Sequence, residues 1–384
     1  MFTSCLVLIF VHLTININTD ESKSEASGEI MFEDQLDGKS VSGWKQEPER
    51  FVDHPGLGPV LFVESKKQSH PTTTGWVGDE SWKNYRIEVE LFGSGEAGGF
   101  LGFDFHVCDN GRQGCNIGFF SPKEGDEVIF EAAGCWNPKT LAWKLWPFAQ
   151  RRARMPKEQW NRIHIDVGER IANVNVNDDP QPVYTAYDLP FDRGGFRFWE
   201  FYGSGYFRNL RITALDDEVK PILDDPWGNV NQWHMIREWE ITEKKNMEYG
   251  NNGIPEILLG NEMKWEKVKT DRRGIINLSA RFPDDLEKGV VFAKTIIKSE
   301  KQDTKTVQIS YTDQLTMWCN GKQIFQGPAR GFYDPGRSEA DGFGRLLPDL
   351  FVVEMELQAG ENMILLRSVV TEPLWGWGFW MRKE

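Results

Sequence analysis

Two pairs of side chains in this sequence have the types and spacing to do chemistry. Asp104 and His106 stand two positions apart in one run of alternating residues, and Glu127 and Glu131 stand four apart in another. Side chains at such spacings share one face of a β-strand. If both strands lie in one sheet, the four groups converge in a cleft, as candidate catalytic residues for cleavage of a glycosidic bond. The alternative is an outer sheet face that is polar only because water covers it.

A second set of residues has the chemistry to bind a ligand without reacting with it. Residues 132–159 form a long irregular stretch rich in Trp and Arg, which is too aromatic to be disordered. Aromatic rings can stack on the apolar face of a pyranose, and arginines can clamp an extended or anionic sugar. The predicted ligand-binding residues, two of them on later strands, are Trp136, Trp143, Trp146, Arg151, Arg154, Asn175 and Glu200. The alternative is that the tryptophans and arginines cover a sheet edge or a second domain.

Two cysteines flank a turn-rich loop between two strand-like runs. Cys108 and Cys115 enclose residues 109–114, and a hairpin would bring their thiols face to face. An exported protein would oxidise such a pair, so we expect a disulfide here, although spacing alone does not fix the connectivity. No CxxC or Cys/His spacing typical of a zinc site occurs, and no cofactor is expected.

The segments that must position these side chains alternate like β-strands. Ile163, Ile165 and Val167 alternate with polar residues, and so do Val174 and Val176. A period of two is typical of half-buried strands. Similar runs of about five to eight residues, separated by Gly, Pro or Asp, fill the rest of the chain. The sequence therefore predicts an all-β protein built from β-sandwiches.

The chain is long enough, at 384 residues, for two such domains. An acidic stretch with two prolines has the composition of a linker, and Asn320-Gly321 further on is a strong hairpin signal. We expect a signal peptide and polar tail, a first sandwich, a linker and a second sandwich over residues 1–28, 29–216, 217–229 and 230–384.

Charge and hydropathy restrict the partners and the location. The 58 acidic and 44 basic residues give a net charge of −14, which disfavours nucleic acid and anionic membranes as partners. The apolar run within residues 1–13 has the length of a signal-peptide core and is too short to span a bilayer. No later segment is apolar enough to span one. We therefore expect export through an N-terminal signal peptide, to a secreted or periplasmic location, without an integral membrane span.

The stretch from Trp160 to Ala214 resembles the last third of a concanavalin A-like lectin/glucanase jelly roll. The resemblance rests on Trp160 at a strand start, a hairpin ending in Asn177-Asp178, a Gly-rich strand and the run Phe207–Ile212. It is most like the domain of 3-keto-disaccharide hydrolases. It implies a carbohydrate ligand on the concave face of one sheet, with Trp160 in the core and Phe207–Ile212 as an edge strand.

The second domain is similar to a galactose-binding-domain-like jelly roll. The motifs that carry this resemblance are Trp318–Lys322 and Ala359–Asn362. Many sandwiches of both families hold a structural calcium, for which the candidate ligands are Asp34, Asp37 and Asp216. Together the two resemblances imply two jelly rolls in tandem.

The catalytic pattern of related glucanases is incomplete here. Laminarinase-type enzymes of the superfamily carry Glu-x-Asp-x-Glu on one strand, whereas Ile129 stands between Glu127 and Glu131. The Cα atoms of residues four apart on a strand are ~13 Å apart. A retaining pair needs its carboxyl groups about 5 Å apart, so only inward-leaning side chains would serve.

The sequence therefore predicts an exported carbohydrate-binding or carbohydrate-processing protein that recognises a glycan on the concave face of its first sandwich. One alternative is a glycoside hydrolase, acting on 3-keto or otherwise modified glycosides. The other is a structural or adhesion module without a sugar site.

Overall fold

The computed structural model covers most of the chain after the leader. It describes residues 28–383 apart from 40, 49, 65–71, 94–99, 112, 121–125, 136–142, 146–150, 157–158, 178, 180, 188, 202, 221–233, 247–253, 255–262, 272, 283–286, 329–345, 347–350 and 374–375. At some strand positions only the backbone is described. The predicted signal peptide lies outside these residues, as does most of the predicted linker.

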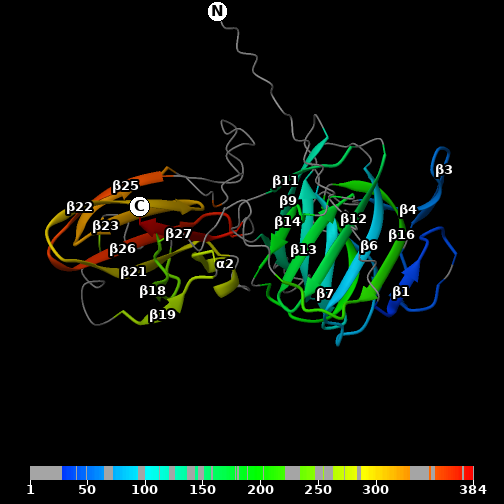
Figure 1. Cartoon of the computed structure of the whole chain (residues 1–384), viewed down its shortest axis with the longest axis horizontal. Coiled ribbons are helices and arrows are strands. Elements are labelled where there is room, and N and C mark those ends of the chain that lie inside the picture. Colours follow the sequence, from blue (N-terminus) through cyan, green and yellow to red (C-terminus); the bar gives the residue numbers. More distant parts are fainter. Residues whose placement is uncertain are drawn as a thin grey trace, which may run out of the picture.

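The described residues form four antiparallel sheets and one short helix, α2 (Leu278–Arg281). Two sheets enclose one apolar core and two enclose another, which gives two bodies (Figure 1). The prediction of an all-β protein made of β-sandwiches is confirmed. The domain boundaries inferred from composition stay a prediction.

Sheet A, the first of the two sheets in the N-terminal body, has eight described strands. Their order across the sheet, with β1 (Ile30–Asp34) paired to β16, is β14 (Tyr184–Ala186), β13 (Ile171–Val176), β12 (Trp160–Gly168), β6 (Tyr85–Gly93), β16 (Ser204–Ala214), β4 (Gly58–Glu64) and β3 (Phe51–His54). Strand β16 therefore lies inside the sheet, because it pairs with β6 on one side and with β4 and β1 on the other. The edge position expected for Phe207–Ile212 is wrong.

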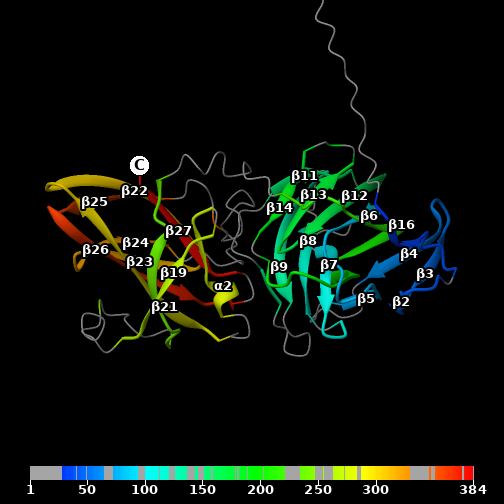
Figure 2. The ribbon, with the colours of Figure 1, turned by 60° about the horizontal axis from the view of Figure 1, so that its bottom comes forward.

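Sheet B packs against sheet A and also has eight described strands. With β11 (Arg151–Arg154) paired to β9, their order is β10 (Trp143–Leu145), β9 (Glu127–Cys135), β8 (Gln113–Phe120), β7 (Phe100–Cys108), β15 (Gly195–Phe201), β5 (Thr72–Val77) and β2 (Trp44–Gln46). The two views agree that β9, β11 and β14 lie on the side of this body nearer the second one, with β3 on the far side (Figures 1 and 2).

The core between sheets A and B follows the alternation in the sequence. Ile163, Ile165 and Val167 of β12 are fully buried, with half-exposed residues between them. They belong to one apolar cluster with Phe103 and Phe198 of sheet B, whose rings lie 6.3 Å apart. Burying each such side chain contributes about 1.5–3 kcal/mol, so the alternation is what fixes which sheet face turns inward.

The C-terminal body is a second sandwich, of sheets C and D. Sheet C has the order β17 (His234–Met235), β27 (Gly378–Lys383), β22 (Asp303–Tyr311) and β25 (Phe351–Leu357), with β20 (Ile275–Asn277) paired to β27. Sheet D has the order β19 (Trp265–Lys269), β18 (Glu238–Thr242), β21 (Gly289–Ser299), β26 (Gly360–Val370), β23 (Gln314–Cys319) and β24 (Lys322–Gln326).

The two motifs singled out in the second domain meet in space. Asn320 and Gly321 turn the β23–β24 hairpin with φ angles of 49° and 84°, the left-handed values of a type I′ turn. The Asn320 side chain donates to Oδ1 of the fully buried Asn362 at 2.8 Å. The predicted hairpin is confirmed, and both motifs serve the scaffold of this body.

The two bodies share apolar contacts. Ile275 and Trp380 of the second body are fully buried and belong to the same apolar cluster as the core of the first. The guanidinium of the buried Arg273 lies 4.3 Å from the ring centroid of Tyr187 in the first body. The bodies are therefore joined by a packed interface as well as by the chain.

Within the described residues, no helix has the length and apolar character needed to cross a membrane.

Candidate functional site

Asp104 is held in a buried ion pair on sheet B. It is 0% exposed, and its Oδ2 accepts from Nε of Arg197 on β15 at 2.5 Å. Its Oδ1 accepts from Nδ2 of Asn116 on β8 at 2.8 Å. Arg197 also donates to the Gly111 carbonyl oxygen. Both carboxylate oxygens are thus engaged, so Asp104 fits the role of tying three strands together better than that of an open catalytic group.

His106 does not join Asp104, contrary to the expected strand phase. The ladder between β7 and β8 shifts register after Phe105, and His106 has a φ of 52°. This bulge turns the ring across the sandwich, where Nε2 donates to the Gly168 carbonyl oxygen at 2.9 Å. The backbone N–H of His106 donates to the Tyr85 hydroxyl at 3.0 Å. Burial lowers the pKa of His106 to about 4, so the ring is neutral near pH 7.

The two glutamates of β9 are described only by their backbone. Glu127 pairs with Arg154 of β11, and Glu131 pairs with Gly118 of β8. Across the sheet, Asp104 of β7 lies opposite Asn116 of β8, which in turn lies opposite Ala133 of β9. Glu131 is two positions before Ala133 on the same strand. Both glutamate side chains lie outside the described part, so a paired catalytic role for them stays a prediction.

The predicted ligand-binding residues fall into three groups. Trp136 and Trp146 lie outside the described residues, and for Trp143 and Arg151 only the backbone is described. Arg154 is the accessible one, with 78% of its side chain exposed and Nη2 3.9 Å from an Asp126 carboxylate oxygen.

The remaining two residues of that set are buried. Glu200 is 0% exposed and pairs with Leu101 on β7, in phase with the core residues Phe196 and Phe198 of its own strand. Direct contact of Glu200 with a ligand therefore does not fit the structure. Asn175 is also buried, and its amide donates to the Asp179 carbonyl oxygen at 3.2 Å, so it supports a loop.

The expected disulfide is not formed. Cys108 and Cys115 are both free, because the register places Cys108 opposite Gln113 and Cys115 opposite Phe105. The hairpin turns at Asp109–Gly111, nearer to Cys108 than to Cys115, so the two cysteines are not level with each other. Cys115 points into the core, where burial raises the pKa of its thiol well above the usual value.

The carboxylates suggested for calcium have other partners. Asp34 accepts from the Leu36 N–H at 2.7 Å through Oδ1 and from Trp44 Nε1 at 2.7 Å through Oδ2. Asp37 pairs with Lys39 at 2.5 Å. Nowhere in the described part do three or more His, Cys, Asp or Glu residues gather to hold a metal. Asp34 therefore does not fit a calcium ligand, and a calcium site stays an untested prediction.

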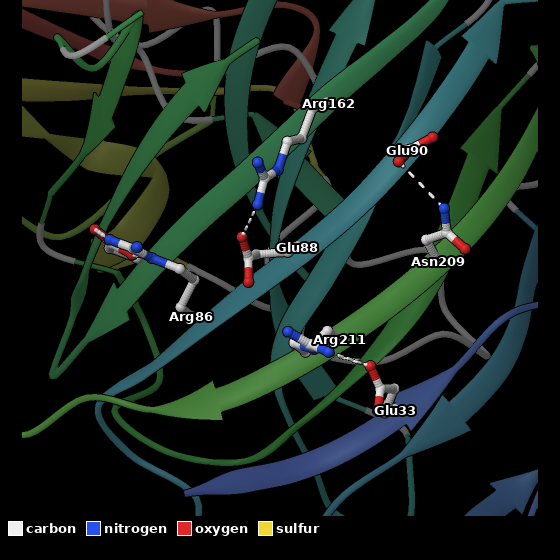
Figure 3. A network of polar contacts seen from close by, with 8 residues as sticks. Glu33, Arg86, Glu88, Glu90, Arg162, Asn209 and Arg211 are labelled. Atoms are coloured by element: carbon white, nitrogen blue, oxygen red, sulfur yellow. Dashed lines mark hydrogen bonds and ion pairs between the residues drawn. The ribbon is translucent and has the colours of Figure 1, made fainter. Parts of the chain in front are cut away.

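The outer face of sheet A carries charges that neutralise one another (Figure 3). Arg86 pairs with Asp166 through two bonds of 2.6 and 2.9 Å, and Arg162 pairs with Glu88 at 2.7 Å. Further along the same face, Arg208 with Glu90 and Arg211 with Glu33 form pairs of 2.5 Å each. These groups hold neighbouring strands together and leave the face balanced in charge.

A cross-strand ladder of half-exposed rings continues on this face. Phe62, Tyr206, Phe92 and Trp160 are direct neighbours in register on β4, β16, β6 and β12. Phe62 and Tyr206 stack at 4.7 Å, and the Arg208 guanidinium lies 4.0 Å from the Trp160 ring centroid. The rings face one another or a guanidinium, which suits sheet stabilisation better than sugar stacking. Trp160 is therefore an outer-face residue, and its expected core position is wrong.

A hollow of about 580 Å³ opens between the two sheets of the first sandwich, beside β11 and the end of β13. We call it the edge depression. Its lining residues, half apolar and half polar, are Ala153, Arg154, Pro156, Gln159, Val176, Asn177, Asp179 and Val183. It combines one accessible cation, two amides and a carboxylate with an apolar surface.

Asn161, a buried residue missed by sequence reasoning, builds the rim of the edge depression. Its amide donates to the carbonyl oxygens of Pro156 at 2.8 Å and Gln159 at 3.2 Å, and its Oδ1 accepts from Asn177 Nδ2 at 3.3 Å. Asn177 has a φ of 57°, and its Oδ1 accepts from the Arg162 N–H at 3.1 Å. The asparagines thus join the loop between β11 and β12 to the loop between β13 and β14. The sequence signal for this rim is the Asn177-Asp178 turn, which the resemblance assigns to the scaffold.

Comparisons with known proteins give likeness to solved structures only. No protein-family model and no curated protein matches the chain. A carbohydrate binding module from Bacillus subtilis is 14% identical and covers 46% of this chain and 98% of its own, with a TM-score of 0.35. A κ-carrageenase from Pseudoalteromonas carrageenovora, in complex with a carrageenan oligosaccharide, is 10% identical over 52% of this chain and 99% of its own, with a TM-score of 0.34. A β-glucanase from Bacillus licheniformis is 11% identical over 49% and 99%, with a TM-score of 0.33. Similarity this low carries no statement about what this chain does.

Proposed function

We propose that this protein binds carbohydrate and that the edge depression of the first sandwich is the binding site. The observation that carries the proposal is its lining: Arg154, Gln159, Asn177 and Asp179 around an apolar surface, in a volume of about 580 Å³. Ligand sites of small molecules are typically about 300–1,000 Å³ and combine an apolar wall with a few convergent polar groups.

The polar groups of the edge depression suit hydroxyl groups. A sugar hydroxyl both donates and accepts, and so does the amide of Gln159. The Asn177 amide, beside its bonds to Asn161 and the Arg162 N–H, has a second N–H and a second lone pair to offer. Arg154 adds donors and Asp179 adds an acceptor. Val176, Val183 and the other apolar residues suit the C–H surfaces of a pyranose. The Asn161 bonds hold the rim before any ligand binds, which lowers the entropic cost of binding.

The described side chains of the two outer faces offer less to a ligand. Sheet A is covered by paired charges and stacked rings. On sheet B, Asp104 and Arg197 neutralise each other in a buried pair. The site proposed here therefore lies at the edge of sheet B, beside Arg154, whereas the sequence pointed to the concave face.

Hydrolysis of a glycoside is the alternative with less support. Asp104 is locked in an ion pair, and His106 lies at another part of the sandwich, bonded to Gly168. The proposal is therefore binding without cleavage. Export of the protein is part of the same proposal, and a mature N-terminus that lies beyond the apolar run of residues 1–13 would support it.

A panel of oligosaccharides, titrated calorimetrically against the full chain, tests the proposal. Arg154→Ala should weaken binding of the best ligand about tenfold or more, since a bond to a charged group contributes about 1.5–3 kcal/mol. Arg193→Ala is the matched control, because Arg193 is an exposed arginine of the same sandwich that pairs with Asp192. Binding of no member of the panel, or equal losses in both variants, would reject the site. Release of reducing sugar during the titration would favour the hydrolase.

A further inference from the structure

A second groove lies in the C-terminal sandwich, where an edge of sheet C meets sheet D. It has a volume of about 340 Å³, and strands β17, β18, β21 and the end of β27 form its walls. The residues that give it chemical character are His234, Arg237, Glu238, Thr295, Ile296 and Lys383. We call it the cationic groove.

Basic groups outnumber acidic ones in this groove, although the chain as a whole has a net charge of −14. Lys383 and His234 are cross-strand neighbours on β27 and β17, and both are exposed. Arg237 lines the same groove, together with the single carboxylate of Glu238. Such a local excess of positive charge on an acidic protein attracts an anionic ligand group.

The position of Arg237 is fixed by the fold. Its Nη1 donates to the Asp271 carbonyl oxygen at 3.2 Å, and its own carbonyl oxygen accepts from the Thr270 N–H at 3.1 Å. A guanidinium held through one of its own N–H groups has a fixed plane, which preorganises it for a planar anion such as a carboxylate. The groove therefore has a directional anchor beside the flexible Lys383.

One wall of the groove is apolar and open to solvent. Ile296 is 49% exposed, one of three large aliphatic side chains that stand out in the described part of the chain. Thr295 Oγ1 donates to the Glu238 carbonyl oxygen at 2.9 Å, which ties β21 to β18 beneath this wall. An exposed isoleucine beside cations favours a ligand with both an anionic group and a C–H surface.

We propose that the cationic groove binds a carboxylate-bearing sugar, such as a uronic acid unit of a glycan. The carboxylate lies against Arg237 and Lys383, and one face of the pyranose ring lies against Ile296. The inference that the ligand is anionic follows from the charges of the groove itself. The inference that the ligand is a sugar rests on the proposed function of the first sandwich.

The test is a calorimetric titration of the full chain with a uronate oligosaccharide, with its neutral counterpart of equal length, and with inorganic phosphate. In this groove the uronate should bind at least about tenfold more tightly than the neutral sugar, because the neutral sugar cannot form the charged hydrogen bonds of the carboxylate. Binding should weaken as salt rises, because exposed charges are screened within about 8–10 Å at physiological ionic strength.

Variants separate the groove from the first sandwich. Lys383→Gln combined with Arg237→Gln should lower uronate affinity at least about tenfold, and Ile296→Ser about threefold or more. Lys322→Gln, which removes an exposed lysine elsewhere in the same sandwich, is the control and should change nothing. Arg154→Ala should leave uronate binding in the groove intact.

Three outcomes would overturn the inference. Equal affinity for the neutral sugar would remove the role of the carboxylate. Phosphate that binds as tightly as the uronate would make this a site for a free anion only. Uronate binding that the double variant leaves unchanged, while Arg154→Ala abolishes glycan binding, would reject the groove and leave the proposed function standing.

Discussion

The buried His106 should make the stability of the protein fall in mild acid. Its pKa is lowered from 6.5 to about 4, chiefly because burial disfavours the charged ring, against a smaller opposing effect of the bond to Gly168. Above about pH 6.5 the ring is neutral in both the folded and the unfolded chain. Between about pH 6.5 and about pH 4 only the unfolded chain binds the proton, so the free energy of unfolding falls as the pH falls. The difference between 6.5 and about 4 corresponds to a loss of about 3 kcal/mol, complete near pH 4.

The assay is equilibrium unfolding in urea, followed by tryptophan fluorescence, from about pH 8 to about pH 4. Other groups titrate in the same range, so the informative quantity is the difference between the wild type and His106→Asn. Asparagine tolerates the left-handed φ of 52° at this position and does not titrate. The free energy of unfolding of the wild type, minus that of the variant, should fall by about 3 kcal/mol between about pH 7.5 and about pH 4. A difference that stays constant over this range would refute the reasoning.

Three further predictions concern the scaffold. Asp104→Asn should destabilise the fold by about 3–5 kcal/mol in urea, because it leaves the buried Arg197 without its countercharge, and a loss below about 1 kcal/mol would contradict this role. Trp380→Ala should cost about 3–5 kcal/mol and uncouple the two bodies, seen as two transitions in scanning calorimetry where the wild type has one; a single unchanged transition would argue against a shared interface. Cys115 should react with iodoacetamide only after denaturation, and Cys108 should react slowly in the native protein, because burial raises the pKa of its thiol to about 11; a peptide map that joins the two by a disulfide would show the register to be wrong.

The sequence was informative wherever the alternation of residues is regular. The buried Ile163 and Ile165 of β12 and the hairpin at Asn320-Gly321 follow from local rules, so both are as expected. The expected position of His106 is wrong because the bulge after Phe105 shifts the phase of the later residues on β7. The expected cysteine pair is wrong because the turn at Asp109–Gly111 is not centred between Cys108 and Cys115. A bulge adds one residue without a clear mark in the sequence.

Long-range pairing explains the other differences. The run Phe207–Ile212 lies inside sheet A because β1, far away in the chain, pairs with it. The edge depression combines Arg154, at the end of β11, with Asn177 and Asp179 in the loop after β13, and Asn161 joins that loop to the one between β11 and β12. Each loop alone has the composition of an ordinary connection, so only the folded arrangement brings out a site.

The most direct test of the central claim is a crystal structure of the full chain with the oligosaccharide that binds best in the panel. The account predicts electron density for a sugar in the edge depression, within hydrogen-bond distance of Arg154 and Asn177. Sugar density over the outer face of sheet B, beside Glu127 and Glu131, would contradict it and restore the site that the sequence suggested.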